Sequence, residues 1–395
     1  RALAIDPAQT LLPGNLSKYR QSRSAVVFDQ QWNSDWFTSL RFLRNDANNP
    51  LSRNVLAGSG FTFPVTDGVL PASLWVFENQ NRQRTDAAVL DVVGHLTALG
   101  ANHTVLLGAD DYRKQFDQAG GTDWAQTTDF YHPSVPGAVA YTDHWSIGTR
   151  ELALYLQDQF EFGHGWHALL GARYQQFDEH VVADTPSMSW TEPLDMSVDG
   201  NFLLPRAALL WQFRPAASLY YSYEENSGST NGLDYTGTPL APESARQHEA
   251  GTRAEWLDGR LAASLALFEL TKHNIASADL EHPGFNIGVG EVESRGLELN
   301  VQGAPLPRWN VLVHVERARP IVITGATGAL ALQSQNLVAG QLLPYVSTRT
   351  ASLWTSYHPT RGAFAGFTVG GGATWASAPS VLEPATIPTS AHHLV

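Results

Sequence analysis

Cysteine is absent from this chain of 395 residues, and so are long apolar runs. Without cysteine the chain can form neither a disulfide scaffold nor a thiolate metal site. No run of 18 or more apolar residues occurs, so no membrane-spanning helix is expected. The longest apolar stretch, residues 87–101, is interrupted by Asp91 and His95.

Charge is also scarce. Charged residues make up 16% of the chain, whereas about a quarter is usual in soluble proteins. The formal net charge of -13 argues against a nucleic-acid partner, because phosphate binding needs clustered lysine and arginine.

Glycine and large aromatics are plentiful, with 33 Gly, 12 Trp and 12 Tyr. Glycine suits tight turns, and Trp and Tyr suit membrane interfaces. No shift in composition and no linker divides the chain. We therefore expect one domain over residues 1–395.

Apolar and polar residues alternate with a period of two, which predicts β-strands with one apolar face. In residues 289–303 the apolar face holds Leu297, Leu299 and Val301, and the polar face holds Ser294, Gly296, Glu298, Asn300 and Gln302. Residues 309–316 repeat the division, with Trp309, Val311, Val313 and Val315 opposite Asn310, His314 and Glu316. The two segments predict a β-hairpin.

Turn signals recur along the chain and predict about seven hairpins, or about 14 strands. Short turns are expected near residues 33–35, 100–102, 163–165, 214–217, 258–259, 303–308 and 358–363. Longer connections are expected near 47–83, 118–147, 182–201, 227–244, 276–288 and 320–344. Short turns at one end and long loops at the other are typical of an outer-membrane barrel.

The strand expected at 166–179 indicates how the membrane is crossed. Trp166 and Tyr174 share its apolar face and stand about 19 Å apart along the membrane normal if the strand tilts near 45°. They are therefore candidates for two aromatic girdles. Asp158 interrupts the apolar face of the strand at 149–161, so we expect it near the short-turn rim.

Four segments resemble the TonB-dependent ferric-siderophore receptors. One long segment carries Pro-Glu-Ser at 242–244, Gln-His-Glu-Ala-Gly at 247–251, Leu-Asp-Gly-Arg-Leu at 257–261 and Ala-Leu-Phe-Glu-Leu-Thr-Lys-His-Asn at 266–274. The others are Leu-Tyr-Leu-Gln-Asp-Gln at 154–159 with Gly-Ala-Arg-Tyr at 171–174, Pro-Arg-Ala-Ala-Leu-Leu-Trp at 205–211, and Gly-Glu-Val-Glu-Ser-Arg-Gly-Leu-Glu-Leu at 290–299. The matches keep the family's order over roughly residues 15–380. They specify strands and turns, not a ligand site.

The resemblance implies an all-β, transmembrane antiparallel β-barrel in the bacterial outer membrane, of 22 strands in the family, of which about 14 are expected here. It implies an N-terminal plug domain, which we expect to be absent from this chain together with the last strands, so that the chain is a fragment. It further implies high-affinity uptake of ferric siderophores, energised by the TonB-ExbB-ExbD complex through a plug segment. We expect a lipid-embedded monomer that is not an enzyme and has no cofactor.

Aromatic residues of the expected long loops are candidates for contact with the ligand, because they offer wide and rigid surfaces. They are Trp124, Tyr131, His132, Tyr141, Trp190 and Tyr235. Other loop aromatics can serve as girdle anchors or loop packing, and Trp145 and Tyr223 are expected in the girdle because they adjoin strands. The siderophore would coordinate the iron, so no protein metal ligand is expected.

Several alternatives remain open. Residues 320–331 resemble a nucleotide-binding Gly-rich turn, but no Asp or Glu lies between Glu316 and Glu383 to bind a ribose. Gly58-Ser59-Gly60 lacks the spacing of a nucleophile elbow, and His164 and His167 are better explained as rim residues than as a metal pair. A porin-like channel, a receptor for cobalamin or another scarce nutrient, a soluble all-β binding or adhesin domain and an outer-membrane hydrolase are the remaining candidates.

Overall fold

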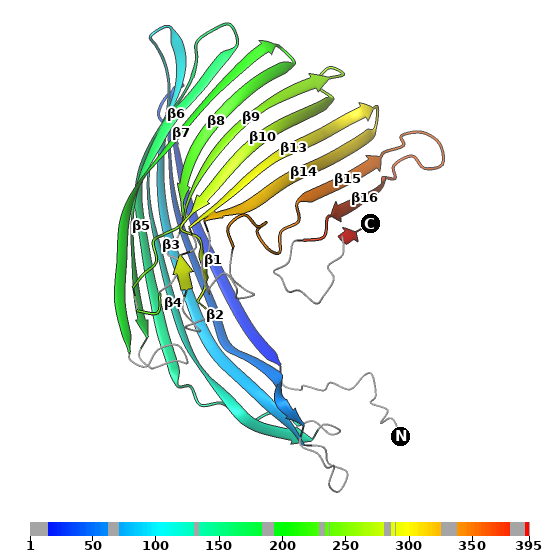
Figure 1. The fold of residues 1–395 in the computed structure, drawn as a ribbon. Helices are drawn as coiled ribbons and strands as arrows, with labels where there is room; N and C mark the ends of the chain where they lie inside the picture. The colour runs from blue at the N-terminus through cyan, green and yellow to red at the C-terminus, as the bar shows by residue number, and fades with distance from the viewer. Residues whose placement is uncertain are drawn as a thin grey trace.

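Strands form all the regular secondary structure in the described part of this computed structural model (Figure 1). The structure describes residues 15–61, 71–129, 134–183, 193–228, 234–236, 238–279, 286–288, 290–324, 338–379 and 392–394. Within these ranges no helix is present that could cross a membrane.

The described residues form seventeen strands. They are β1 (Leu16–Gln31), β2 (Trp36–Phe61), β3 (Pro71–Ala98), β4 (Ala101–Asp129), β5 (Asp143–Glu161), β6 (Trp166–Ala183), β7 (Leu194–Arg214), β8 (Ala217–Ser227), β9 (Ser244–Trp256), β10 (Leu261–His273), β11 (Ala276–Ala278), β12 (Asn286–Gly288), β13 (Glu291–Leu306), β14 (Trp309–Thr324), β15 (Arg349–Tyr357), β16 (Val369–Ala376) and β17 (His392–Leu394).

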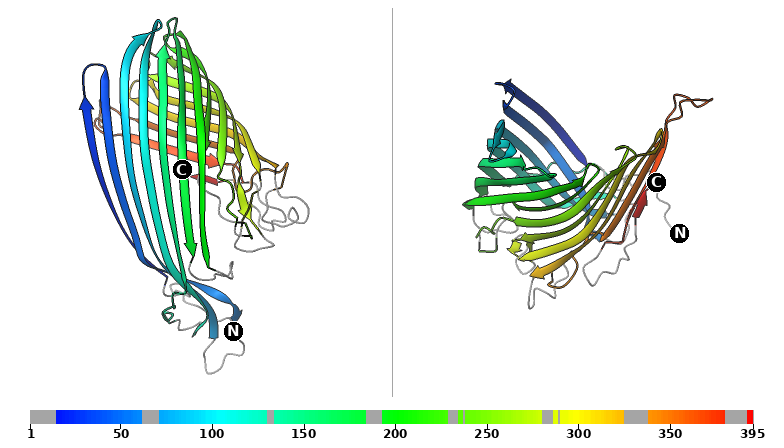
Figure 2. Two further views of the ribbon diagram at one scale, coloured as in Figure 1. Left: turned by 90° about the vertical axis from the view of Figure 1, so that its left-hand side faces the viewer. Right: turned by 90° about the horizontal axis from the view of Figure 1, so that it is seen from above.

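Fifteen of these strands form one antiparallel sheet, in which each strand pairs with the next in sequence. The order runs from β1 to β10, then through β13 to β17, and the short strands β11 and β12 pair with each other in the connection between β10 and β13. The sheet curves into a wall with one concave side, which Figure 2 shows from the side and from above. Within the described residues β1 and β17 are its edges.

All seven predicted turns connect strands at one end of the sheet, the short-turn end, but the turn predicted near 358–363 is longer than expected, because β15 ends at Tyr357 and β16 begins at Val369. The turn between β9 and β10 contains Leu257, Asp258 and Gly259, all with positive φ (57°, 58° and 77°). Asp-Gly is a preferred pair for such a turn because both residues tolerate this backbone region. The longer connections lie at the opposite end, the loop end.

Three of the predicted long connections are wrong in extent, and one of them is 182–201, because β7 already begins at Leu194. Most of residues 47–83 belong to β2 and β3, which pair from Trp36 opposite Gly94 to Phe61 opposite Ala72. Likewise β4 continues to Asp129 and β5 begins at Asp143, so much of 118–147 is strand. A membrane strand needs only about 9–11 residues, so these strands extend well beyond the bilayer.

The convex outer face carries the apolar rows. Residues directly opposite each other in register share a face, and along one row Leu107 on β4, Leu156 on β5 and Ala172 on β6 are in line. Leu154 and Leu203 of this face are 60% and 66% exposed. The predicted outward row of β13 and β14 is confirmed too, because Leu299 lies opposite Val315 and Val301 opposite Val313.

An aromatic belt follows the outer face at the short-turn end. Trp166 stacks on Trp211 at 5.4 Å between ring centroids, and Phe162 stacks on Trp166 at 6.3 Å. In β14 and β15, Trp309 lies opposite Tyr357. Such a belt is expected where a strand crosses from hydrocarbon to water.

Asp158 lies at the short-turn rim, as predicted. Its carboxylate is 2.7 Å from the imidazole Nδ1 of His103 on β4. A polar partner at the rim makes a carboxylate tolerable on an otherwise apolar face.

Little of the described chain is a dry core. One small cluster consists of Val55, Leu74, Val76 and Val139, and another of Val292 and Val322. In a soluble sandwich or barrel the aliphatic face of every strand would pack inward. Here the aliphatic side chains point outward, so the surrounding lipid takes the place of a core.

Candidate functional site

The concave face holds a chain of polar side chains that spans five neighbouring strands, the concave network. It consists of Arg41 on β2, Asp91 on β3, Asp110 on β4, Tyr155 on β5 and Arg173 on β6. Arg41 forms an ion pair with Asp91, and the Tyr155 hydroxyl donates to Asp91 at 2.6 Å. Arg173 binds both carboxylate oxygens of Asp110, one of them at 3.0 Å, which makes a bidentate pair.

Tyr155 joins the two ion pairs. The Arg173 guanidinium carbon lies 5.7 Å from the centroid of the Tyr155 ring, within the range of a cation–π contact. The ring lies over Gly108 on β4, where any Cβ atom would collide with it. Glycine at this position therefore lets the tyrosine lie flat along the wall.

A hollow of about 440 Å³ opens beside the concave network. Its lining includes Asp110, Tyr155 and Arg173, together with Arg206 on β7 and Glu224 on β8. The planar guanidinium group of arginine can donate two hydrogen bonds at once to a carboxylate or a phosphate, and tyrosine offers an amphipathic surface. The hollow can thus contact a molecule that combines anionic and aromatic groups.

The other half of the concave wall is acidic. Tyr220 on β8 donates to Glu249 on β9 at 2.7 Å. On β13 Asn300 donates to Glu298 at 2.6 Å, and the amide oxygen of Asn300 is 2.9 Å from Nδ1 of His314 on β14. The concave wall thus presents arginines paired with carboxylates at β2–β6 and carboxylates with tyrosine, asparagine and histidine partners at β8–β14.

The loop-end extension of β2, β3 and β4 is held by one partly buried ion pair. Arg53 on β2 donates from Nε to Glu78 on β3 at 2.6 Å, and from Nη1 to the carbonyl of Pro136 at 3.3 Å. The segment before β5 also places Val139 against Val55 and Val76. Arg53 thereby fastens that segment to one face of the extension.

Trp124 lies at the end of β4, not in a loop as predicted. Its ring makes edge contacts with Trp75 and Phe77 of β3, each at 5.2 Å between centroids. These rings lie on the face opposite Val76, because side chains alternate along a strand. Trp124 is still 44% exposed, so it remains able to contact a ligand.

Tyr141 lies on the other face of the extension, near Arg53 and Glu78. Burial raises the pKa of its phenol, and the Glu78 carboxylate raises it further. Tyr141 and Trp124 are therefore not parts of one aromatic cluster.

Tyr235 lies in the connection between β8 and β9 and is 56% exposed. The turn that presents it is fixed by Asp234, whose Oδ1 accepts from the Oγ1 of Thr236 at 2.6 Å and from the backbone N–H groups of Thr236 and Thr238 at 2.9 Å. The other predicted contacts, Tyr131, His132 and Trp190, lie outside the described residues.

Two further placements concern the girdle. Trp145 is not a girdle residue, because it faces the concave side, where its ring makes an edge contact with Phe116 of β4 at 6.2 Å. Tyr223 faces outward next to His248, at 4.9 Å between ring centroids. In the part of the chain that the structure describes, no group of three or more His, Asp or Glu side chains could hold a metal ion.

The concave network was not predicted as a site. Alternation does place Arg173 and Gln175 on the polar face, but Arg173 and Asp110 are 63 residues apart in sequence. Only the pairing of β4, β5 and β6 shows that they meet. The signal in the sequence is a polar face that is unusually rich in charge and tyrosine.

Comparison with known proteins identifies the family. Residues 4–394 match the family model described as "TonB dependent receptor-like, beta-barrel". The metal-pseudopaline receptor CntO of Pseudomonas aeruginosa is 30% identical over 206 residues, which cover 52% of this chain and 28% of that receptor. The ferric-pyoverdine 358 receptor of Pseudomonas putida is 24% identical over 376 residues, covering 91% of this chain and 43% of that protein. This chain thus spans 28% to 43% of the length of these relatives.

Solved structures show the same fold. The ferric-catecholate import receptor Fiu from E. coli K12 superposes with a TM-score of 0.76 at 17% identity, covering 99% of this chain and 59% of that one. The pyoverdine outer membrane receptor FpvA from Pseudomonas aeruginosa PAO1 gives a TM-score of 0.72 at 19% identity, covering 92% and 51%. The chain therefore belongs to the TonB-dependent receptor-like β-barrel family, whose members lie in the bacterial outer membrane.

Proposed function

We propose that this chain forms part of the barrel wall of an outer-membrane receptor that takes up ferric siderophores. The observation that carries the proposal is the contrast between an apolar outer face and a concave face with a charged, tyrosine-bearing hollow, in a chain of this family. A wall of this kind separates lipid from a polar passage.

The chemistry of the concave wall supports a bulky anionic ligand. Arg173 and Arg206 lie beside Tyr155 in one hollow, so they can meet charged and aromatic parts of a chelate. The proposal assigns coordination of the iron to the siderophore. The wall then needs to contact only the organic surface.

We further propose that the exposed loop-end aromatics contact the siderophore before it enters the passage. Of the predicted aromatics that the structure describes, Trp124 and Tyr235 are exposed and Tyr141 lies deeper. Tyr131, His132 and Trp190 complete the proposed set.

The energy source proposed for import is the TonB-ExbB-ExbD complex, acting on a plug segment outside this chain. The receptor is proposed to be a monomer in the outer membrane, to need no cofactor and not to be an enzyme. Residues 1–395 are proposed to form a single barrel-wall domain.

A second candidate function is suggested by one relative. CntO is named a metal-pseudopaline receptor and is 30% identical to this chain over 206 residues. Chelates of metals other than iron are therefore the alternative ligand class, ahead of cobalamin or passive diffusion.

Uptake by the whole receptor tests the proposal. Cells that lack other siderophore receptors would be given radiolabelled ferric chelates of the hydroxamate, catecholate and carboxylate classes, with cobalamin and a metal-loaded non-iron chelate in parallel. We expect saturable uptake of one ferric class that stops when TonB is deleted. Uptake of small solutes that is linear in concentration and persists without TonB would show a porin instead.

The concave hollow is tested in the same assay. Arg173→Gln with Arg206→Gln is expected to raise the half-saturation concentration about a hundredfold, since the loss of two charge-assisted hydrogen bonds of about 1.5 kcal/mol each corresponds to roughly that factor. Arg150→Gln on the outer face of β5 is the matched control and should leave uptake unchanged. Equal effects of the two changes would remove the hollow from the proposal.

A further inference from the structure

The two faces of β4–β7 exchange character beyond the membrane. Within the apolar band, the row that contains Leu156 lies on the convex face. Nearer the loop end an apolar row lies on the concave face instead, because side chains alternate along a strand. In this second row, the concave apolar row, each residue lies directly opposite the next across four strands: Phe116, Ile147, Val181 and Met196.

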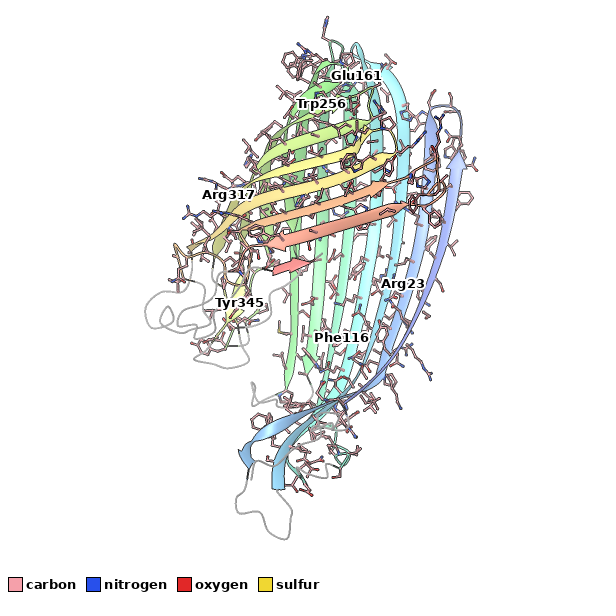
Figure 3. The ribbon with its side chains drawn as sticks, turned by 90° about the vertical axis from the view of Figure 1, so that its right-hand side faces the viewer. Arg23, Phe116, Glu161, Trp256, Arg317 and Tyr345 are labelled. Carbon is pink, nitrogen blue, oxygen red and sulfur yellow. The ribbon has the colours of Figure 1, made fainter. Side chains whose placement is uncertain are left out.

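The concave apolar row lies outside the hydrocarbon layer. Val181 follows the belt residue Trp166 by 15 residues on β6, which is roughly 35 Å along the membrane normal at a strand tilt near 45°. The hydrocarbon core is only about 30 Å thick. Figure 3 shows Phe116 of this row toward the loop end and Glu161 at the short-turn end. Lipid chains therefore do not cover the row.

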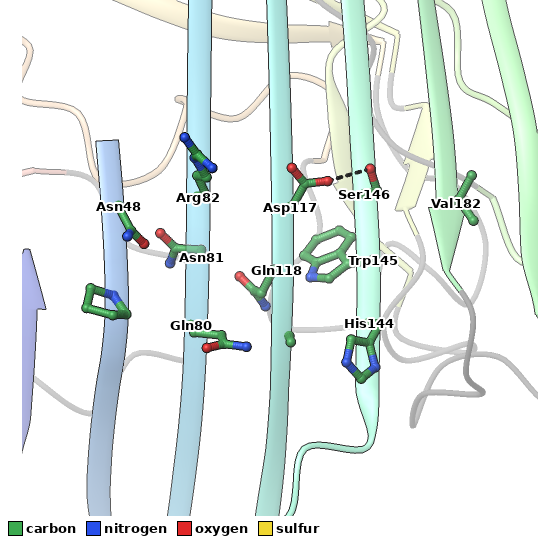
Figure 4. Close-up of a pocket in the computed structure, with 12 residues that line it drawn as sticks. Asn48, Gln80, Asn81, Arg82, Asp117, Gln118, His144, Trp145, Ser146 and Val182 are labelled. Carbon is green, nitrogen blue, oxygen red and sulfur yellow. Dashed lines mark hydrogen bonds between the residues drawn. The ribbon is translucent and has the colours of Figure 1, made fainter. Parts of the chain in front are cut away.

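The convex face at the same level is polar. There Ser146 donates to Asp117 at 2.9 Å, and His180 lies 2.7 Å from the carboxylate of Asp195. Figure 4 shows the hydrogen bond between Ser146 and Asp117, with Trp145 next to it in the chain. At this level the sheet thus presents polar groups to the outside and apolar groups to the passage, which is the reverse of its arrangement in the membrane.

The concave apolar row is partly open to solvent. Its four side chains are each half-buried, and Trp145, which makes an edge contact with Phe116, is 38% exposed. Four strands at the usual spacing make the row about 14 Å wide. Most of that width consists of Ile147, Val181 and the adaptable side chain of Met196. Such a surface is stabilised when an aliphatic chain covers it.

The row is in line with the charged hollow on the same face. Along β6, Val181 is eight residues from Arg173, which is about 26 Å at the usual rise per residue of a strand. Between them Phe177 stacks on Phe202 of β7, at 5.6 Å between ring centroids. A Cβ atom on Gly200 would lie 2.6 Å from the Phe177 ring, so glycine lets this ring lie flat along the wall. One wall thus offers charged contacts and, further toward the loop end, apolar ones.

We propose that the ligand is an amphiphilic ferric chelate, whose aliphatic acyl chain lies on the concave apolar row while its anionic part meets the arginines of the hollow. The inference rests on the proposed function and narrows its ligand class. A hydrophilic chelate would leave the row in water, whereas an acyl chain removes both the row and itself from water. The polar convex face directs such a chain to the inside of the wall.

Uptake of paired chelates by the whole receptor tests the inference. The probes are radiolabelled ferric hydroxamate, catecholate and carboxylate chelates, each with and without a dodecanoyl chain. In the class that is taken up, we expect the acylated chelate to have a half-saturation concentration at least tenfold lower in the wild type. Val181→Gln should reduce this difference to less than threefold. The matched control is Val182→Gln, which changes the adjacent valine on the convex face and should keep the full difference.

The outcomes separate this inference from the proposed function. Equal half-saturation concentrations with and without the acyl chain would overturn the inference and leave TonB-dependent uptake in place. A preference that survives Val181→Gln, even if that variant has a lower thermal midpoint, would also overturn it and would show that the row packs against another part of the receptor. The absence of TonB-dependent uptake of every chelate would remove both the function and the inference.

A second measurement locates the chain. The whole receptor in phosphatidylcholine nanodiscs would be titrated with the acylated chelate carrying bromine on its acyl chain. Bromine quenches nearby tryptophan, so we expect less quenching in Trp145→Phe than in the wild type. Equal quenching in the two proteins would place the chain elsewhere and contradict the inference.

Discussion

The two faces of β5 carry opposite kinds of side chain. Leu152, Leu154 and Leu156 point outward and are at least 40% exposed, while Glu151 and Tyr155 point inward and make hydrogen bonds. The two sets alternate residue by residue on one backbone. Because a shift of one residue would exchange them, the difference shows that the two sides of the strand face different solvents.

The same contrast explains how the wall can lack a core. An aliphatic surface of this extent would aggregate in water, but in hydrocarbon it costs nothing. The polar face then has to satisfy its groups by itself, through the concave network and the acidic residues of β9–β14. Stability on one face comes from lipid contact, and on the other from hydrogen bonds and ion pairs.

A charge placed on the outer face should have the largest effect. Leu154→Arg moves a guanidinium into the apolar band and should cost about 2–4 kcal/mol. Gln157→Arg on the concave face of the same strand is the control and should cost far less. Urea unfolding of the whole receptor in lipid bilayers measures both. Equal losses would mean that the two faces do not see different solvents.

Breaking the bidentate ion pair should have the next largest effect. Asp110→Ala leaves the guanidinium of Arg173 without its partner. Since both side chains are partly exposed (19% and 29%), we expect a loss of about 1–2 kcal/mol, measured by the same unfolding experiment. Asp110→Asn, which keeps one acceptor, should lose less; a larger loss for Asn than for Ala would contradict the role of the pair.

A smaller effect is expected from the hydroxyl that links the two ion pairs. Tyr155→Phe removes the hydrogen bond to Asp91 and should cost about 1 kcal/mol. Tyr112→Phe on the same face of β4 is the matched control, because the structure describes no hydrogen bond for its hydroxyl. The difference between the urea unfolding midpoints of the two variants gives the contribution of this hydrogen bond to stability. A change in the control as large as in Tyr155→Phe would assign the effect to packing.

The smallest expected effect on stability concerns the turn at Asp234, which lies between β8 and β9 and belongs to neither face of the sheet. The hydroxyl of Thr236, followed by backbone N–H groups, holds the pKa of Asp234 below its ordinary value. Because the folded pKa is depressed, the stabilising effect on the turn is present above the ordinary carboxylate pKa and is lost as pH falls through the folded value. NMR titration should find the lowered pKa, and Thr236→Val should move it upward. An unchanged pKa in that variant would remove the threonine as the cause.

Much of the fold is predictable because its signal is local. Five consecutive residues already show the two faces of a strand, because the apolar Leu297, Leu299 and Val301 alternate with the polar Glu298 and Asn300. The structure places these two sets on opposite faces. The turn positions are predictable for the same reason, since Asp258-Gly259 favours a hairpin through its own backbone preferences. The rim position of Asp158 followed from where its strand had to end.

The length of β2–β4 was not predictable in this way. Asn48, Asn49 and Pro50 have low strand propensity, so this part of the chain looks like a loop. The structure nevertheless pairs Asn49 with Asn81 and Asn48 with Arg82. Long neighbouring strands on both sides, together with the Arg53–Glu78 pair, override the local preference. Trp124 was placed in a loop by the same error.

The candidate site depended on contacts between distant residues. The alternation of apolar and polar residues placed Arg173 on the polar face. It could not show that Arg173 pairs with Asp110, or that Arg317 lies opposite Arg349. The sequence alone determined which residues of a regular strand share a face, because side chains alternate along a strand. The tertiary structure decided which residues meet across strands, because register is fixed by turns and by the sum of many pairings along whole strands.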